Sequence, residues 1–142
     1  MAHELKIIQI RESGYKTLYT FGTWKIASSV AIEREKIRCM DRHLETDEAF
    51  VMLEGSGFLF TWGGEDRPMQ TRGTVLELNH VYLVPRGTWH AHVWKQQTKV
   101  LIVENADTGA WNSETIPVPK AQCKEMEEYW KNIDSVVKPE ML

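Results

Sequence analysis

The chain has 142 residues, of which 42% are hydrophobic, and this size and composition predict one globular domain spanning residues 1–142. Its 17 basic and 20 acidic residues give a net charge of -3, without the basic region that a nucleic-acid-binding surface needs. No apolar run is long enough to span a bilayer, and the two cysteines form neither a disulfide framework nor a CxxC zinc pair. We therefore expect a cytoplasmic protein that binds neither nucleic acid nor membrane.

Most of the chain is predicted to form β-strands, because runs rich in Val, Ile, Thr and aromatic residues recur between Gly, Pro, Asn and Asp. The expected strands cover residues 5–10, 16–21, 25–32, 36–43, 49–53, 57–62, 74–76, 81–84, 89–94 and 99–104. Many short strands joined by close turns indicate a mainly all-β sandwich or barrel.

The last quarter of the chain has a different character. Residues 105–119 are polar and are predicted to form an extended crossing segment. Residues 120–134 carry apolar side chains at helical spacing, which predicts one amphipathic α-helix that starts after Pro119 and packs on the outside of the β-domain.

Two short segments place histidine beside a predicted tight turn between strands. The first contains Asp41, His43, Glu48 and Gly55, and the second contains Asn79, Pro85, Gly87 and His90. Imidazole and carboxylate groups at such strand ends can converge on one metal ion. These segments are where we expect the chemistry of the chain.

The two segments resemble the two sequence motifs of the cupins, over about residues 37–103. Six residues separate Glu48 from Gly55, as in the first motif, and residues 85–90 match the core of the second motif without a gap. Asp41 replaces the first histidine, Asn79 stands where glycine is usual, and Trp94 stands in place of the closing asparagine. The resemblance implies a jelly-roll barrel, with one C-terminal helix here, of the kind found in small single-domain bacterial cupins.

The resemblance also implies that His43, Glu48 and His90 face the barrel interior together. Alternation along a strand places Asp41 on the side of His43, and His92 on the side of His90. The candidate metal ligands are thus His43, His90, Glu48 and Asp41, a set that favours divalent Fe, Mn, Ni or Zn. His92 and Glu48 are the candidates for proton transfer.

Two of the candidates also have a purely structural interpretation. Glu48 fits a solvated turn, and Asp41 can pair with Arg42, Arg34 or Arg38 on the strand surface. Trp62, Trp89 and Trp94 are expected in the core or at the barrel rim.

Three functions remain open from the sequence. The first is a metal-dependent enzyme with isomerase-like or lyase-like Lewis-acid chemistry on a small sugar, keto acid or hydroxy acid, or dioxygenase chemistry with iron. The second is a small-ligand-binding module, and a metal-free lyase is a further variant of the same pocket. The third is an inert relic of the fold. We also expect a homodimer in which the strand at residues 5–10 pairs across the two copies.

Overall fold

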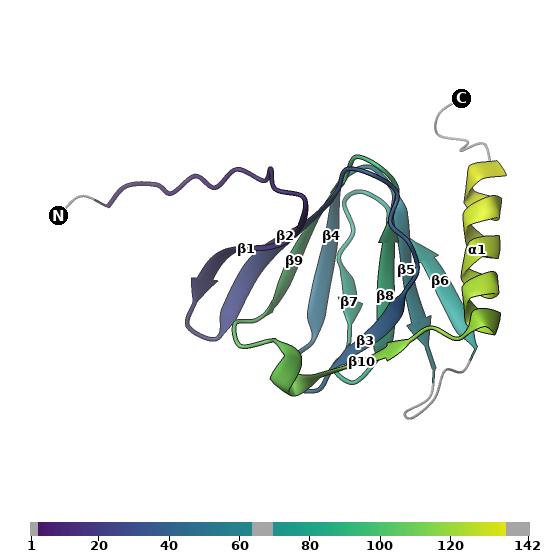
Figure 1. Cartoon of the computed structure of the whole chain (residues 1–142). Coiled ribbons are helices and arrows are strands. Elements are labelled where there is room, and N and C mark those ends of the chain that lie inside the picture. Colours follow the sequence, from purple (N-terminus) through teal and green to yellow (C-terminus); the bar gives the residue numbers. More distant parts are fainter. Residues whose placement is uncertain (1–2, 64–69, 136–142) are drawn as a thin grey trace.

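Two five-stranded sheets and a C-terminal helix make up the fold of the computed structural model, which describes residues 3–63 and 70–135 (Figure 1). The first sheet has the order β1 (Gly14–Phe21), β2 (Trp24–Ala31), β9 (Thr98–Asn105), β4 (Glu48–Glu54) and β7 (Tyr82–Val84). The second has the order β10 (Ser113–Pro117), β3 (Cys39–His43), β8 (Trp89–Trp94), β5 (Gly57–Trp62) and β6 (Thr71–Val75). A 3-10 turn (Ala110–Asn112) precedes β10, and α1 spans Lys120–Ser135.

Strands that are distant in the sequence lie side by side, because neighbouring strands within each sheet pair antiparallel in a jelly-roll order. β9 lies between β2 and β4, and β8 lies between β3 and β5. The predicted mainly β fold with one C-terminal helix is confirmed.

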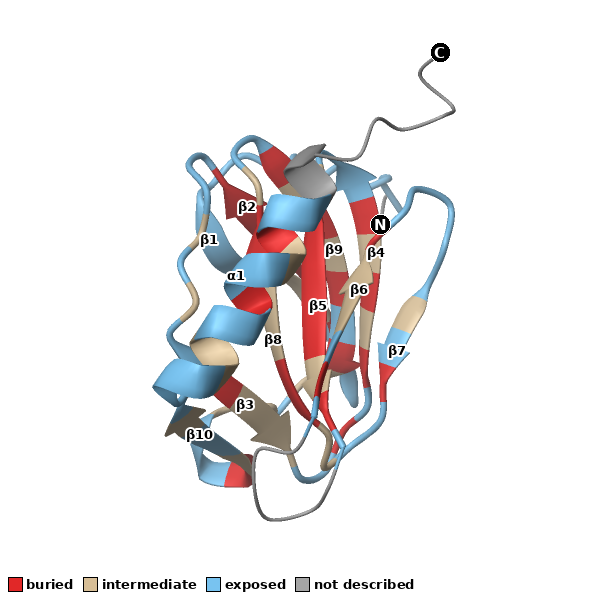
Figure 2. Ribbon diagram, turned by 90° about the vertical axis from the view of Figure 1, so that its right-hand side faces the viewer, coloured by how far each residue is buried: buried red, intermediate tan, exposed pale blue. Residues whose placement is uncertain are grey.

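Two apolar layers hold the structure together. The first lies between the sheets and includes Phe50, Trp94 and Ile102, which are all almost fully buried. The second lies between the outer face of the second sheet and α1, where Phe60 and Trp130 are buried. Figure 2 shows buried positions along α1 and on β5 behind it. The helix therefore covers the outside of the sheet, as its amphipathic pattern predicts.

Two turns explain residues that the motifs single out. Asn79 adopts φ 65°, so asparagine takes the left-handed conformation for which glycine is usual. Gly55 has φ 92°, and a Cβ atom there would lie 2.6 Å from Cα of Thr98. Glycine is therefore required at this turn, where the backbone passes close to the start of β9.

The prediction of a strand at residues 5–10 is wrong for the single chain. These residues form no strand, and Leu5 and Ile7 are 87% and 85% exposed on an arm that extends away from the sheets (Figure 1). An apolar run becomes a strand only when another strand supplies hydrogen-bonding partners, and none of the described strands pairs with it here.

The prediction for residues 105–119 missed a strand. β10 pairs with β3 from Ser113 opposite His43 to Pro117 opposite Cys39. β10 is an edge strand, a position where the missing N–H of proline is tolerated.

Among the described residues, no helix has both the length and the apolar character that a membrane span requires.

Candidate metal site

His43, Glu48 and His90 come from three different strands. His43 ends β3, Glu48 begins β4 across the following turn, and His90 is the second residue of β8. The two turns that carry them are tied together, because the N–H of Gly87 donates a 2.7 Å hydrogen bond to the carbonyl of His43. A second bond joins the N–H of Arg86 to the carboxylate of Asp47 at 2.8 Å. The two sequence motifs thus meet at one end of the barrel.

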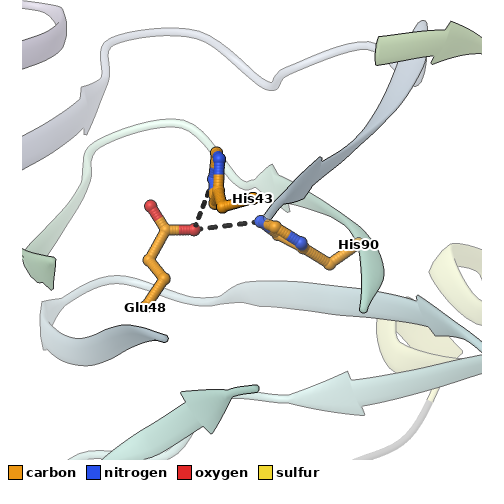
Figure 3. A group of neighbouring side chains, drawn as sticks. All are labelled: His43, Glu48 and His90. Atoms are coloured by element: carbon orange, nitrogen blue, oxygen red, sulfur yellow. Dashed lines mark hydrogen bonds and ion pairs between the residues drawn. The ribbon is translucent and has the colours of Figure 1, made fainter. Parts of the chain in front are cut away.

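The rings of His43 and His90 converge on one carboxylate oxygen of Glu48 (Figure 3). Oε1 of Glu48 lies 2.9 Å from Nε2 of His90 and 3.4 Å from Nε2 of His43. One potential ligand atom from each of the three lies within 4.8 Å of the others. Glu48 and His90 are buried and His43 is half-buried, so water has restricted access to the group.

The second nitrogen of each imidazole is held by its own partner. Nδ1 of His90 donates to the carbonyl of Thr88 at 2.9 Å, and Nδ1 of His43 lies 2.8 Å from the hydroxyl of Ser113. A histidine ligand of a metal usually has its other nitrogen hydrogen-bonded in this way, which fixes the ring and leaves Nε2 free to coordinate. Two imidazole nitrogens and one carboxylate oxygen form a donor set that fits a divalent transition metal.

The charges of the group depend on one another. Burial alone would raise the pKa of Glu48, but its hydrogen bonds to His43 and His90 outweigh burial and hold the pKa well below its usual range. Burial would lower the pKa of His43, but the hydrogen bond and charge of Glu48 outweigh it, so that this pKa is raised. Glu48 is therefore a carboxylate at neutral pH, the form that binds a cation.

Glu104 is a further functional candidate, outside the residues predicted from the motifs. It lies on β9 and is 6% exposed. Its Oε1 accepts a 2.6 Å hydrogen bond from the hydroxyl of Tyr15 and lies 3.5 Å from Nζ of Lys25. Alternation along β9 was the available signal, because Glu104 continues the buried series of Val100 and Ile102.

Glu104 and Glu48 act on each other as neighbouring carboxyl groups. Burial, followed by the neighbouring carboxylate of Glu48, raises the pKa of Glu104 to about 7. Oε2 of Glu104 is buried and receives no hydrogen bond from the described residues. A proton on Glu104 removes the repulsion between the two groups, so this side chain holds an exchangeable proton near neutral pH.

The group lies in the wall of an open cavity of about 510 Å³ between the sheets. Lining residues that carry charge or a titratable ring or hydroxyl are Tyr15, Lys25, Glu35, Lys36, Arg38, Asp41, His43, Glu48, His90, His92 and Glu104. A volume of this size holds a small metabolite, and the polar lining suits a polar one.

The remaining predicted residues lie around the same cavity, outside the three-residue group. The carboxylate of Asp41 accepts a 2.5 Å hydrogen bond from the hydroxyl of Thr115. His92 stacks on Trp94 with ring centres 4.5 Å apart, and its Nδ1 lies 2.9 Å from Oε1 of Glu35. The structure thus places Asp41 and His92 within the cavity wall, and their predicted roles stay predictions.

The predicted structural role of three tryptophans is confirmed. Trp62, Trp89 and Trp94 are each at most 3% exposed and belong to the two apolar layers.

Comparison with known proteins shows the fold. No protein-family model matches the sequence, and no curated protein matches it. A cupin-2 domain protein from Shewanella frigidimarina has a similar structure, with 16% identity and a TM-score of 0.51 over 68% of this chain and 84% of that one. A Bacillus halodurans protein has 18% identity and a TM-score of 0.54 over 70% of this chain and 74% of that one.

The structure of Pac13 from Streptomyces, described as a nucleoside dehydratase, is also similar. It has 9% identity to this chain and a TM-score of 0.57, over 80% of this chain and 87% of that one. At these identities the likeness concerns the fold, which hosts several kinds of function.

Proposed function

We propose that this protein, which has the cupin fold, binds one divalent transition-metal ion through His43, Glu48 and His90 and acts on a small polar metabolite. The observation that carries the proposal is the approach of two Nε2 atoms to one buried carboxylate oxygen, at 2.9 and 3.4 Å. Three protein ligands beside an open cavity leave coordination positions for a substrate. Fe, Mn, Ni and Zn in their divalent states all accept this donor set.

When bound, such an ion supplies a Lewis acid for a carbonyl or hydroxyl oxygen of the substrate. Asp41 is proposed as a further ligand or as a hydrogen-bonding neighbour of the ion. Its carboxylate is occupied by Thr115, so coordination would require that hydrogen bond to break.

His92 is proposed to move a proton. Its Nδ1 lies within hydrogen-bonding distance of Glu35, and its ring stacks on Trp94, so its orientation is fixed. None of the described residues hydrogen-bonds to its Nε2. A fixed imidazole with one free nitrogen beside a cavity can take a proton from a substrate carbon or return it. Isomerisation of a sugar, or lyase chemistry on a keto or hydroxy acid, needs a group of this kind.

A second candidate function is metal-free lyase chemistry in the same cavity. The observation that favours it is the coupling of Glu104 to Glu48, which keeps a proton on Glu104 near neutral pH without any ion. In this case Glu48, proposed from its sequence for proton transfer, remains a carboxylate whose low pKa makes it a weak base, so Glu104 is the stronger candidate to exchange a proton. The similar fold of a nucleoside dehydratase is compatible with this alternative. Binding of a small ligand without turnover is the non-catalytic variant of either candidate.

We further propose that the protein forms a homodimer through the arm formed by residues 3–12. Leu5 and Ile7 are exposed on an extended segment that pairs with none of the described strands. Pairing with a second copy would bury these side chains and supply the missing backbone hydrogen bonds.

The direct test of the function is metal-dependent turnover. The metal-free protein is reconstituted separately with Fe(II), Mn(II), Ni(II) and Zn(II) and incubated with a panel of sugars and of keto and hydroxy acids, with products followed by NMR. We expect at least one ion to restore turnover in the wild type and in His80→Ala, whose ring is exposed on a loop. The double variant His43→Ala, His90→Ala should be inactive. Equal turnover with and without metal would support the metal-free alternative instead.

A further inference from the structure

The carboxylates that line the cavity contact other residues, whereas two lining cationic side chains contact none that the structure describes. From this we infer that the substrate of the proposed site carries a carboxylate or phosphate group. This inference rests on the proposed function and names the class of its substrate. The anion would bind Lys36 and Arg38, which line the cavity just before β3.

Every carboxylate that lines the cavity already has a partner in the protein. Glu48 contacts both histidines and Glu35 contacts His92. Glu104 is bonded to Tyr15 and lies beside Lys25. In addition, Asp41 accepts a hydrogen bond from the hydroxyl of Thr115. These contacts already balance part of each carboxylate's charge, so a cationic substrate would gain less from them than an anion would gain from cations without a partner.

Two of the three lining lysine and arginine side chains have no such partner. Lys25 is engaged by Glu104 and by the carbonyl of Thr108. Lys36 and Arg38 make no hydrogen bond or ion pair through their side chains with any residue that the structure describes. An anionic substrate would thus gain charge-assisted hydrogen bonds without breaking any.

Lys36 and Arg38 lie on the segment that leads into β3, and both line the cavity. Ile37, between them, lines the cavity and also packs against the apolar layer under α1. The carbonyl of Arg38 accepts a hydrogen bond from the N–H of Val118. The N–H of Glu35 donates a hydrogen bond to the carbonyl of Trp94. The segment is therefore fixed at both ends.

The position of the cations also limits the length of the substrate. Asp41 lies opposite His90 in the pairing of β3 with β8. Arg38 is three residues before Asp41, which corresponds to about 10 Å along an extended chain. A phosphorylated sugar or a dicarboxylic acid could place one end at Arg38 and the other at the histidines. An uncharged molecule of the same length would leave the cations unused.

Anion binding by the full chain tests the inference. The metal-free protein is titrated with inorganic phosphate and, separately, with succinate, and binding is followed by NMR shifts of the Arg38 and Lys36 backbone amides and of the Arg side-chain Nε–H groups. We expect saturable binding in the wild type and about tenfold or greater weakening in Lys36→Gln, Arg38→Gln, because charge-assisted hydrogen bonds are lost. Preference for phosphate or for succinate identifies which anionic group the subsite accepts.

The matched control is Lys120→Gln, Lys124→Gln, which removes the same charge from exposed positions of α1. Its anion affinity should equal that of the wild type. Equal weakening in both double variants, or no saturable binding in the wild type, would overturn the inference. A separate zinc titration distinguishes the two proposals, because Lys36→Gln, Arg38→Gln should bind zinc normally. Failure of the wild type to bind zinc would contradict the metal site and leave the anion result intact.

Discussion

Nε2 of His90 lies 2.9 Å from Oε1 of Glu48, although 42 positions separate the two residues in the chain. The contact exists because the turn after β3 and the turn before β8 are hydrogen-bonded to each other through Gly87 and His43. Two short motifs thereby become one site, and substitutions in either motif should affect the same property.

Replacement of Glu48 by Gln should weaken metal binding and lower the pKa of His43. The carboxylate supplies one ligand, and its hydrogen bond and charge outweigh burial to raise that pKa. Loss of an outer partner of a metal ligand already costs roughly 10–100-fold in affinity, so loss of the ligand itself should cost at least as much. Zinc titration calorimetry and NMR titration of the histidine ring protons measure the two effects.

Glu35→Gln is the matched control for that experiment, because Glu35 pairs with His92 instead. It should leave zinc affinity and the His43 titration close to those of the wild type. If Glu48→Gln bound zinc as tightly as this control, Glu48 would not be a ligand.

Glu104→Gln should change how stability depends on pH. Its carboxyl pKa is raised from 4.5 to about 7 in the folded protein, by burial first and by Glu48 second. The folded state therefore holds a proton that the unfolded state releases, and the stability from this group is present below pH 4.5 and lost as pH rises through about 7. The metal-free variant should lose less stability than the wild type across this window.

Urea unfolding of the metal-free proteins at several pH values from 4.5 to 8 checks this expectation. Glu54→Gln, at an exposed position 3.9 Å from Lys99, serves as the control and should follow the wild type. Parallel curves for the wild type and Glu104→Gln would show that the Glu104 pKa is not raised.

Trp130→Ala should destabilise the fold by about 3–5 kcal/mol, the usual cost of removing a large buried aromatic side chain. Trp130 is 2% exposed, lies edge-to-face with Phe58 at 5.4 Å, and carries the guanidinium of Arg34 over its ring. Trp111→Ala removes the same side chain from a position that is 70% exposed, so it should change the free energy of unfolding by no more than about 0.5 kcal/mol. Similar losses in both variants, measured by urea unfolding, would argue against tight packing of α1 on the sheet.

The double variant Leu5→Asp, Ile7→Asp should convert a dimer into a monomer, because charge on the arm opposes its burial against a second copy. Light scattering should give twice the chain mass of 16.5 kDa for the wild type and the single mass for the variant. Ile32→Asp, Val81→Asp introduces the same charge at two exposed apolar positions outside the arm and should remain dimeric. A monomeric wild type would contradict the dimer proposal.

The motif residues and the strand periodicity were predictable because both are local. The spacing from Glu48 to Gly55 and from Pro85 to His90 specifies turns, and the β-branched and aromatic runs specify strands. Turns at the ends of paired strands then bring the histidines near one another. The same locality explains why the helix, with its regular apolar spacing, was predicted to within one residue of its observed end.

The rest of the site was not predictable because it depends on strand order. Glu104, Tyr15 and Ser113 reach the cavity from β9, β1 and β10, and no local pattern assigns these strands to their neighbours. For the arm the prediction was wrong because its apolar pattern favours a strand, but none of the described strands pairs with it.

Metal content of the purified protein tests the central claim most directly. Untagged wild type, His80→Ala and the double variant His43→Ala, His90→Ala are purified in parallel and analysed by mass spectrometry for Fe, Mn, Ni and Zn. We predict close to one ion per chain in the first two proteins and loss of that ion in the double variant. A wild type that holds no metal, even after reconstitution with each of the four ions, would contradict the claim that His43, Glu48 and His90 form a metal site.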